Sequence, residues 1–69
     1  MAEIPKQFAL YKDRTGEWRW RLHAANGKII ADSAEAYTTK ANCIHGARLV
    51  ASVATGAGIW NVVDQKWEA

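Results

Sequence analysis

The sequence predicts a small α+β protein with the element order βββαβ, in which one helix packs on one face of an antiparallel sheet. Three observations predict this fold. One segment alternates apolar and polar residues, an Asn-Gly turn follows it directly, and a later stretch spaces its apolar residues by three and four. With 69 residues, 49% of them hydrophobic, the chain suits one globular domain over residues 1–69 and has no room for a second.

The first two strands are predicted over residues 7–12 and 17–24, joined by a turn in which Gly16 can adopt a positive φ. In the first strand, Phe8 and Leu10 share one face and Tyr11 lies on the other. The second strand has the clearest alternation of the chain. Its apolar face carries Trp18, Trp20 and Leu22, and its polar face carries Arg19, Arg21 and His23. This pattern is typical of a half-buried antiparallel strand.

A third strand is predicted over residues 28–33 because Asn26-Gly27 is a strong hairpin signal. A two-residue turn there would place His23 opposite Ile30 and Arg21 opposite Asp32. The second of these pairs is an exposed ion pair, which contributes about 0.2–1 kcal/mol.

The helix is predicted over residues 40–54, with Thr38 or Thr39 as its N-cap. Its sheet-facing stripe consists of Cys43, Gly46, Ala47, Val50 and Ala54. The glycine-rich stretch 55–58 ends the helix, and a final β-branched strand is expected over residues 59–64. A single helix can cover only one face of the sheet.

Composition limits the classes of function. The formal net charge of +2 is too small to argue for a nucleic-acid or membrane partner, and one cysteine excludes an internal disulfide and a cysteine metal cluster. Residues 1–7 lack the apolar core of a signal peptide, and the uncharged stretch 49–61 is too short to span a bilayer. We therefore expect a cytoplasmic protein without membrane association. The small core also favours a homodimer.

Specific motifs resemble the YegP-like family of small bacterial proteins of unknown function. They are Tyr11-Lys12-Asp13, the segment from Gly16 to Leu22, Ala24-Ala25-Asn26-Gly27, and the helix start Thr39-Lys40-Ala41-Asn42-Cys43 with Gly46 and Val50 after it. The likeness extends over about residues 8–53. It implies a βββαβ unit that pairs with a second unit through one continuous sheet and exchanged C-terminal strands, with residues 55–58 as the hinge. Because that family has no established activity, the resemblance carries over fold and assembly but no catalytic residues.

The sharpest candidate binding surface is the polar sheet face formed by Tyr11, Arg19, Arg21 and His23. Basic residues next to aromatic ones can hold a nucleic-acid backbone and stack bases. The alternative interpretation, which we favour, is the solvated side of a one-sided sheet. In the same way, Trp18 and Trp20 could line a ligand pocket, although a Trp pair on an alternating strand is more often core.

Reactive groups are few. Cys43, the only thiol, lies on the predicted buried stripe, and His45 points to a different helix face, so the two do not form a dyad. Neither His23 nor His45 has metal-ligand spacing, and Glu35 is a lone loop carboxylate. We therefore expect no catalytic, cofactor or metal residues. The prediction is a non-enzymatic homodimeric binding or assembly module with an unidentified protein partner. The alternatives are a weak nucleic-acid binder and a small-ligand carrier or enzyme at the dimer seam.

Overall fold

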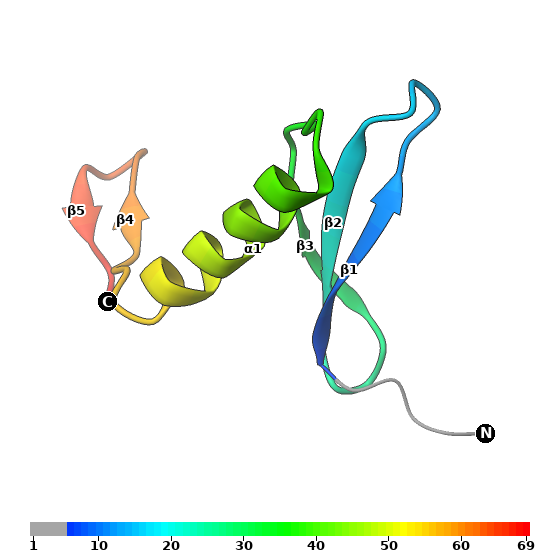
Figure 1. Cartoon of the computed structure of the whole chain (residues 1–69). Helices are drawn as coiled ribbons and strands as arrows, with labels where there is room; N and C mark the ends of the chain where they lie inside the picture. The colour runs from blue at the N-terminus through cyan, green and yellow to red at the C-terminus, as the bar shows by residue number, and fades with distance from the viewer. Residues whose placement is uncertain (1–5) are drawn as a thin grey trace.

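A computed structural model of the protein describes residues 6–69, so residues 1–5 of the predicted domain lie outside the described part (Figure 1). It has the predicted α+β architecture, a three-stranded antiparallel sheet with one helix. The strands of the sheet are β1 (Gln7–Lys12), β2 (Trp18–His23) and β3 (Ile29–Asp32). They lie in the order β1-β2-β3, and both β1 and β3 are edges.

The pairing of β1 with β2 follows from the sequence pattern and the turn between them. Phe8 lies opposite Leu22 and Leu10 opposite Trp20, so both strands turn their apolar residues to the same face. The turn is closed by the Asp13 carboxylate, which accepts from the backbone N–H groups of Thr15 at 2.9 Å and Glu17 at 3.1 Å. Gly16 has a φ of 86°, a conformation that glycine adopts at little cost.

The turn between β2 and β3 differs from the predicted two-residue turn. Gly27 has a φ of 85° while Asn26 stays at negative φ, and the Gly27 N–H donates to the Ala24 carbonyl at 2.8 Å. This is a type I turn followed by a left-handed glycine, the usual three-residue hairpin loop. The extra residue produces a bulge at Leu22/His23, so that His23 lies opposite Ile29 and not Ile30. The predicted Arg21–Asp32 register pair is present.

The helix α1 spans Lys40–Ala54 and begins at Thr39, whose hydroxyl accepts from the Asn42 N–H at 3.1 Å. It contacts β1 and β2 but not β3. Cys43 and Ala47 of α1 are buried against Trp20, and the remaining members of this core are partly buried. They are Phe8, Leu10, Trp18, Leu22, Tyr37 and Val50. On the helix the core therefore extends from Cys43 to Val50, and Ala54 of the predicted stripe is exposed.

The predicted single strand over residues 59–64 is a small hairpin instead. Strand β4 (Trp60–Asn61) pairs with β5 (Lys66–Trp67), and the chain turns between them. The Asn61 side chain accepts from the Asp64 N–H at 2.9 Å, and Gln65 has a φ of 53°. An Asn that bonds the backbone ahead of it favours a turn over a continued strand. This local bond explains why the β-branched Val62 and Val63 do not extend the strand.

The molecule is elongated, because its C-terminal part extends away from the sheet (Figure 1). Among the named elements, β4 and β5 contact only each other. The Cα radius of gyration is 14.4 Å, whereas a compact domain of this length has a radius of about 11 Å. We call residues 49–69 the C-terminal arm, since they include the end of α1 and the hairpin beyond it.

Candidate functional site

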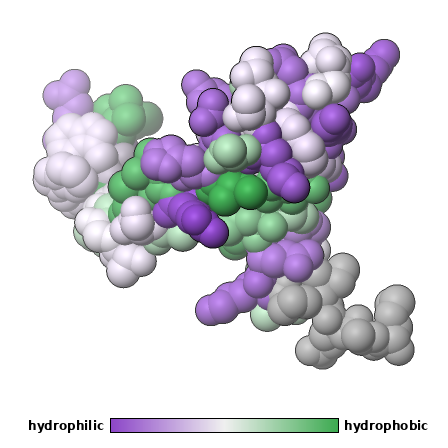
Figure 2. Space-filling model, in the orientation of Figure 1, coloured by the Kyte–Doolittle hydropathy of each residue, from purple (hydrophilic) through white to green (hydrophobic). Residues whose placement is uncertain are grey.

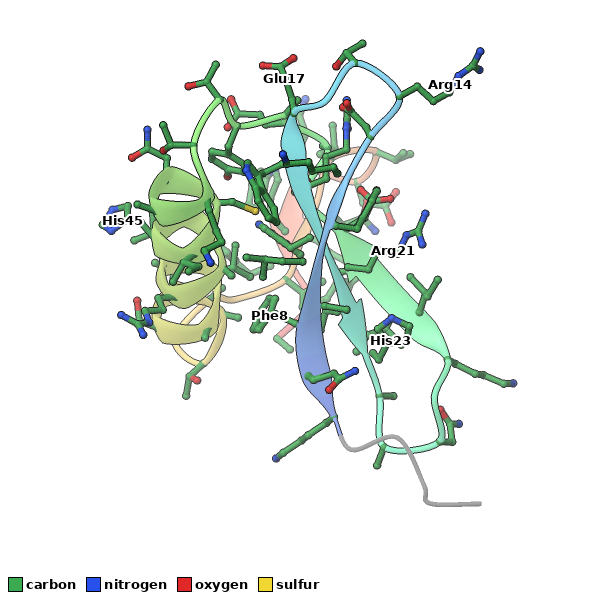
Figure 3. The ribbon with its side chains drawn as sticks, turned by 45° about the vertical axis from the view of Figure 1, so that its right-hand side comes forward. Phe8, Arg14, Glu17, Arg21, His23 and His45 are labelled. Atoms are coloured by element: carbon green, nitrogen blue, oxygen red, sulfur yellow. The ribbon has the colours of Figure 1, made fainter. Side chains whose placement is uncertain are left out.

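The polar sheet face contains the four predicted surface residues, but two of them are engaged within the chain. Figure 3 shows Arg21 and His23 on the side of the sheet opposite α1. The Arg19 Nε donates to the Asp13 carboxylate at 2.8 Å and its Nη1 to the Ala34 carbonyl at 3.3 Å. The His23 Nδ1 lies 3.0 Å from the Gly27 carbonyl oxygen. Arg19 and His23 therefore support the two turns that flank β2.

Arg21 is the guanidinium of this face that remains available to a ligand. It stacks over the Tyr11 ring at 4.2 Å from the centroid, a cation–π arrangement. The register brings Asp32 opposite Arg21, but the Asp32 carboxylate accepts from the Ala34 N–H at 3.0 Å. Within the described residues no ion pair joins the two. The structure therefore brings Tyr11 and Arg21 together and directs Arg19 to Asp13.

Hydrogen bonding at Asp13 lowers the pKa of its carboxyl far below the usual range. The Thr15 hydroxyl donates to it at 2.6 Å, and the Arg19 guanidinium donates to its other oxygen. The same contact with Asp13 raises the pKa of Arg19. Both groups are charged at neutral pH, and their bonds fix the β1–β2 turn. This pair therefore stabilises the fold.

The predicted alternatives inside the core take structural positions. The Trp20 ring packs edge-on against Phe8, with centroids 5.1 Å apart, and is 4% exposed. Its indole Nε1 is buried without an acceptor among residues 6–69. Lys12 lies over the Trp18 ring at 5.2 Å. These contacts place Trp20 in the core beneath α1 and Trp18, partly buried, against that core.

Cys43 is fully buried, and desolvation raises the pKa of its thiol, so the unreactive protonated form dominates at neutral pH. His45 points away from the sheet (Figure 3), as the sequence spacing indicated. Among residues 6–69, no group of three or more His, Cys, Asp or Glu side chains is placed to hold a metal ion. Over the same part of the chain, no helix has the length and apolar character needed to cross a membrane.

The C-terminal arm exposes the surface that sequence reasoning missed. Figure 2 shows hydrophobic residues along α1 and again at the turn of the C-terminal hairpin. The exposed large apolar residues of the arm are Leu49, Val53, Ile59, Trp60, Val62, Val63 and Trp67. An open groove of about 330 Å³ lies on the C-terminal part of α1, lined by Leu49, Val50, Val53 and Ala54. Apolar surface of this extent marks an interaction site more often than solvated surface.

Comparison with known proteins places the chain among small uncharacterised ones. Residues 13–60 match the model of a domain of unknown function, DUF1508. The chain belongs to the DUF1508 family. This match confirms the predicted resemblance and assigns no activity. It ends at Trp60, so most of the C-terminal hairpin lies beyond it.

Three relatives extend the comparison, and all are UPF0339 proteins. One from Neisseria meningitidis serogroup B is 47% identical over 55 residues, which is 80% of this chain and 96% of that protein. One from Treponema denticola is 41% identical over 56 residues, covering 81% and 95%. One from Methanosarcina acetivorans is 42% identical over 53 residues, covering 77% and 90%. No solved structure matches the chain.

Proposed function

We propose that this DUF1508 protein is a non-enzymatic homodimeric assembly module whose C-terminal arm packs on a second copy of the chain. The extended shape of the single chain is the observation that carries the proposal. The chain exposes 5650 Å² and has a mass of 7.7 kDa. A compact monomer of that mass exposes roughly 4300 Å². The excess supports an association partner that covers the arm.

The amount and the kind of exposed surface both fit self-association. The excess of roughly 1300 Å² exceeds the area of about 800 Å² that each partner buries in a standard protein interface. The arm presents both a projecting hairpin and an open groove on α1. A second copy offers the complementary feature to each, which gives a closed twofold arrangement.

The sheet offers a further route to pairing. The edges β1 and β3 leave backbone groups available, and an added strand from a second copy would satisfy them. The family resemblance implies a continuous sheet with exchanged C-terminal strands. A continuous sheet of this kind would use the edge strands β1 and β3. We assign the segment 55–58 as the hinge, because Gly56 and Gly58 allow the chain to change direction there.

The non-enzymatic role rests on the state of the reactive groups. The only thiol is buried in the core. The acid opposite the stacked Arg21 is Asp32, and its carboxylate accepts from the Ala34 N–H instead. A single unpaired cysteine also fits a reducing compartment, and we propose a cytoplasmic location on that ground. The assembled dimer would present its two Tyr11–Arg21 faces to a protein partner.

The test is the absolute mass in solution, measured by light scattering on a size-exclusion column over a hundredfold dilution range. We expect twice 7.7 kDa. Val53→Glu, which puts a charge in the groove, should shift the mass towards the monomer. Arg48→Glu, at an exposed position on the same helix, should leave it dimeric. A folded wild-type monomer at every concentration would refute the proposal.

Nucleic-acid binding is the second candidate, favoured by one observation, the stacking of Arg21 on Tyr11. Dimerisation would double this patch and its field. Titration of single-stranded oligonucleotide into the protein at low salt, followed by tryptophan fluorescence, tests it. Binding should weaken as salt rises and on Arg21→Ala, with Arg14→Ala as the exposed control. An unchanged signal at low salt removes this candidate.

A further inference from the structure

The C-terminal hairpin has one aromatic face. Trp60 and Trp67 lie opposite each other in the β4–β5 pair, and their rings meet edge-on with centroids 5.1 Å apart and an interplanar angle of 66°. Their exposed fractions are 46% and 68%. Two large aromatic rings side by side on a short hairpin form an apolar surface that the described residues 6–69 leave partly exposed.

The opposite face of the hairpin is polar and bonded within itself. The Asn61 Nδ2 donates to the Glu68 carboxylate at 2.9 Å and to that of Asp64 at 3.2 Å. Lys66 lies 3.8 Å from the other Glu68 oxygen. The hairpin is therefore amphipathic, and its backbone is closed by bonds between Ile59 and the last two residues. The hairpin can therefore dock on an apolar surface as a formed unit, with its Trp60–Trp67 face in the contact.

The groove on α1 has the matching character. Its four lining residues are all aliphatic, and Leu49 and Val53 are 54% and 57% exposed. The groove and the Trp60–Trp67 face therefore match in apolar character.

We propose that the Trp60–Trp67 face of one chain covers the α1 groove of a second copy, while the Asn61–Lys66 face stays in solvent. This inference rests on the proposed dimer and names the side chains that hold it together. The occupant is a second copy because the excess exposed surface of the chain is larger than the area that each partner of a standard dimer buries. The hairpin also contacts no other named element of its own chain. Trp67 lies beyond the family match, so this contact extends the interface past the DUF1508 segment.

The first experiment compares three variants by the dissociation constant of the dimer. Trp67→Ala should raise it at least about tenfold, since buried aromatic anchors dominate interface energies. Trp67→Phe, which keeps an aromatic ring in the hairpin, should raise it by about threefold or less. Lys66→Ala is the matched control on the opposite face and should change it by about threefold or less, because exposed ion pairs contribute little.

The second experiment tests which face is buried, and it does not depend on a truncated side chain. A Val53→Cys chain is mixed with a Trp67→Cys chain that carries a size tag, and the mixture is oxidised. We expect a disulfide between the two different chains. The same mixture with Lys66→Cys should give little. Wild type is the background, since its Cys43 is fully buried.

The outcomes separate this inference from the proposed function. A wild-type dimer that is unaffected by Trp67→Ala and forms no 53–67 disulfide overturns the inference and leaves the dimer standing. Equal cross-linking from positions 66 and 67 also overturns the inference, because neither face of the hairpin is then preferred in the contact with the groove. A wild-type chain that is monomeric throughout overturns both proposals. A weakened Trp67→Ala dimer with selective 53–67 cross-linking supports the inference.

Discussion

The Tyr37 ring lies directly against Gly46 of α1, and a Cβ added at Gly46 would come within 2.8 Å of the Tyr37 Cζ and closer still to its hydroxyl. Tyr37 is held in this position by backbone bonds to Trp18, of 2.7 Å and 2.8 Å, across an isolated bridge. The glycine in the helix is therefore a consequence of the loop that precedes it. Glycine lowers the helix propensity at position 46, but it leaves the space in which the Tyr37 ring packs against α1.

Gly46→Ala should destabilise the protein by about 1 kcal/mol, because overpacking costs about 1–3 kcal/mol and the gain in helix propensity is only about 1. Tyr37→Phe removes the atom nearest to the added Cβ, so Gly46→Ala should cost less in that background. Gly56→Ala is the control, since nothing lies within 4 Å of its added Cβ. Urea unfolding at one fixed protein concentration measures the wild type, the two single variants, the double variant and the Gly56→Ala control. An equal cost in both backgrounds would contradict the contact.

Thr39→Ala should lower the free energy of unfolding by about 1 kcal/mol, because it removes the N-cap hydroxyl that accepts from Asn42. The sequence allowed either of two adjacent threonines as the cap, and Thr38 offers a matched control one residue away. Thr38→Ala should change stability by about 0.5 kcal/mol or less. Thermal unfolding of the two variants checks this, and a larger effect of Thr38→Ala would contradict the assigned cap.

Asp13 should contribute stability that depends on acid pH. Its pKa is lowered in the folded state, chiefly by the Thr15 hydroxyl and then by Arg19. Its contribution is therefore present above the unfolded value of about 3.9 and declines as the pH falls below that value towards the lower folded pKa. Asp13→Asn should lower the urea midpoint at pH 7, and the gap from wild type should narrow between pH 4 and pH 2.

The control for this pH series is Glu35→Gln, an exposed loop carboxylate. It should give midpoints close to those of wild type at each pH. A gap between Asp13→Asn and wild type that stays constant down to pH 2 would mean that the Asp13 charge does not matter. The effect would then belong to the shape of the side chain.

Cys43 should react with a thiol reagent only when the protein unfolds, because it is fully buried and burial raises its pKa. At pH 8 the folded protein should react more slowly than the urea-unfolded chain by on the order of a hundredfold or more. The measurement is the absorbance of the released thiolate over time. Rapid reaction in the folded state would restore Cys43 as a candidate nucleophile.

The sheet and the helix could be predicted because their local signals agree. The alternation from Trp18 to Leu22 and the helical stripe at Cys43 and Ala47 each specify a buried face, and the structure places those faces against one another. The pairing of Arg21 with Asp32 could also be predicted, because the alternating pattern and the Asn26-Gly27 turn together restrict the register of the hairpin. These features depend on residues close in sequence.

The remaining features depend on competition between signals. Asn26-Gly27 suits two hairpin loops, and the structure contains the three-residue form with a bulge at His23. Val62 and Val63 favour a strand, but the side-chain bond of Asn61 favours a turn. The signal that could have shown the hairpin is the pair Trp60 and Trp67, flanking a segment that begins with Asn61. The alternation of residues 18–22 also gave no sign that the Arg19 side chain would bond to the Asp13 carboxylate in the adjacent turn.

The most direct test of the account is an isotope-filtered NMR experiment on mixed dimers of labelled and unlabelled chains. It detects only proximity between different chains. We predict contacts between the methyl groups of Leu49, Val50 and Val53 on labelled chains and protons of residues 59–67 on unlabelled ones. If these contacts appear only within one chain, the arm folds back on itself, and the proposal of assembly through the C-terminal arm is wrong.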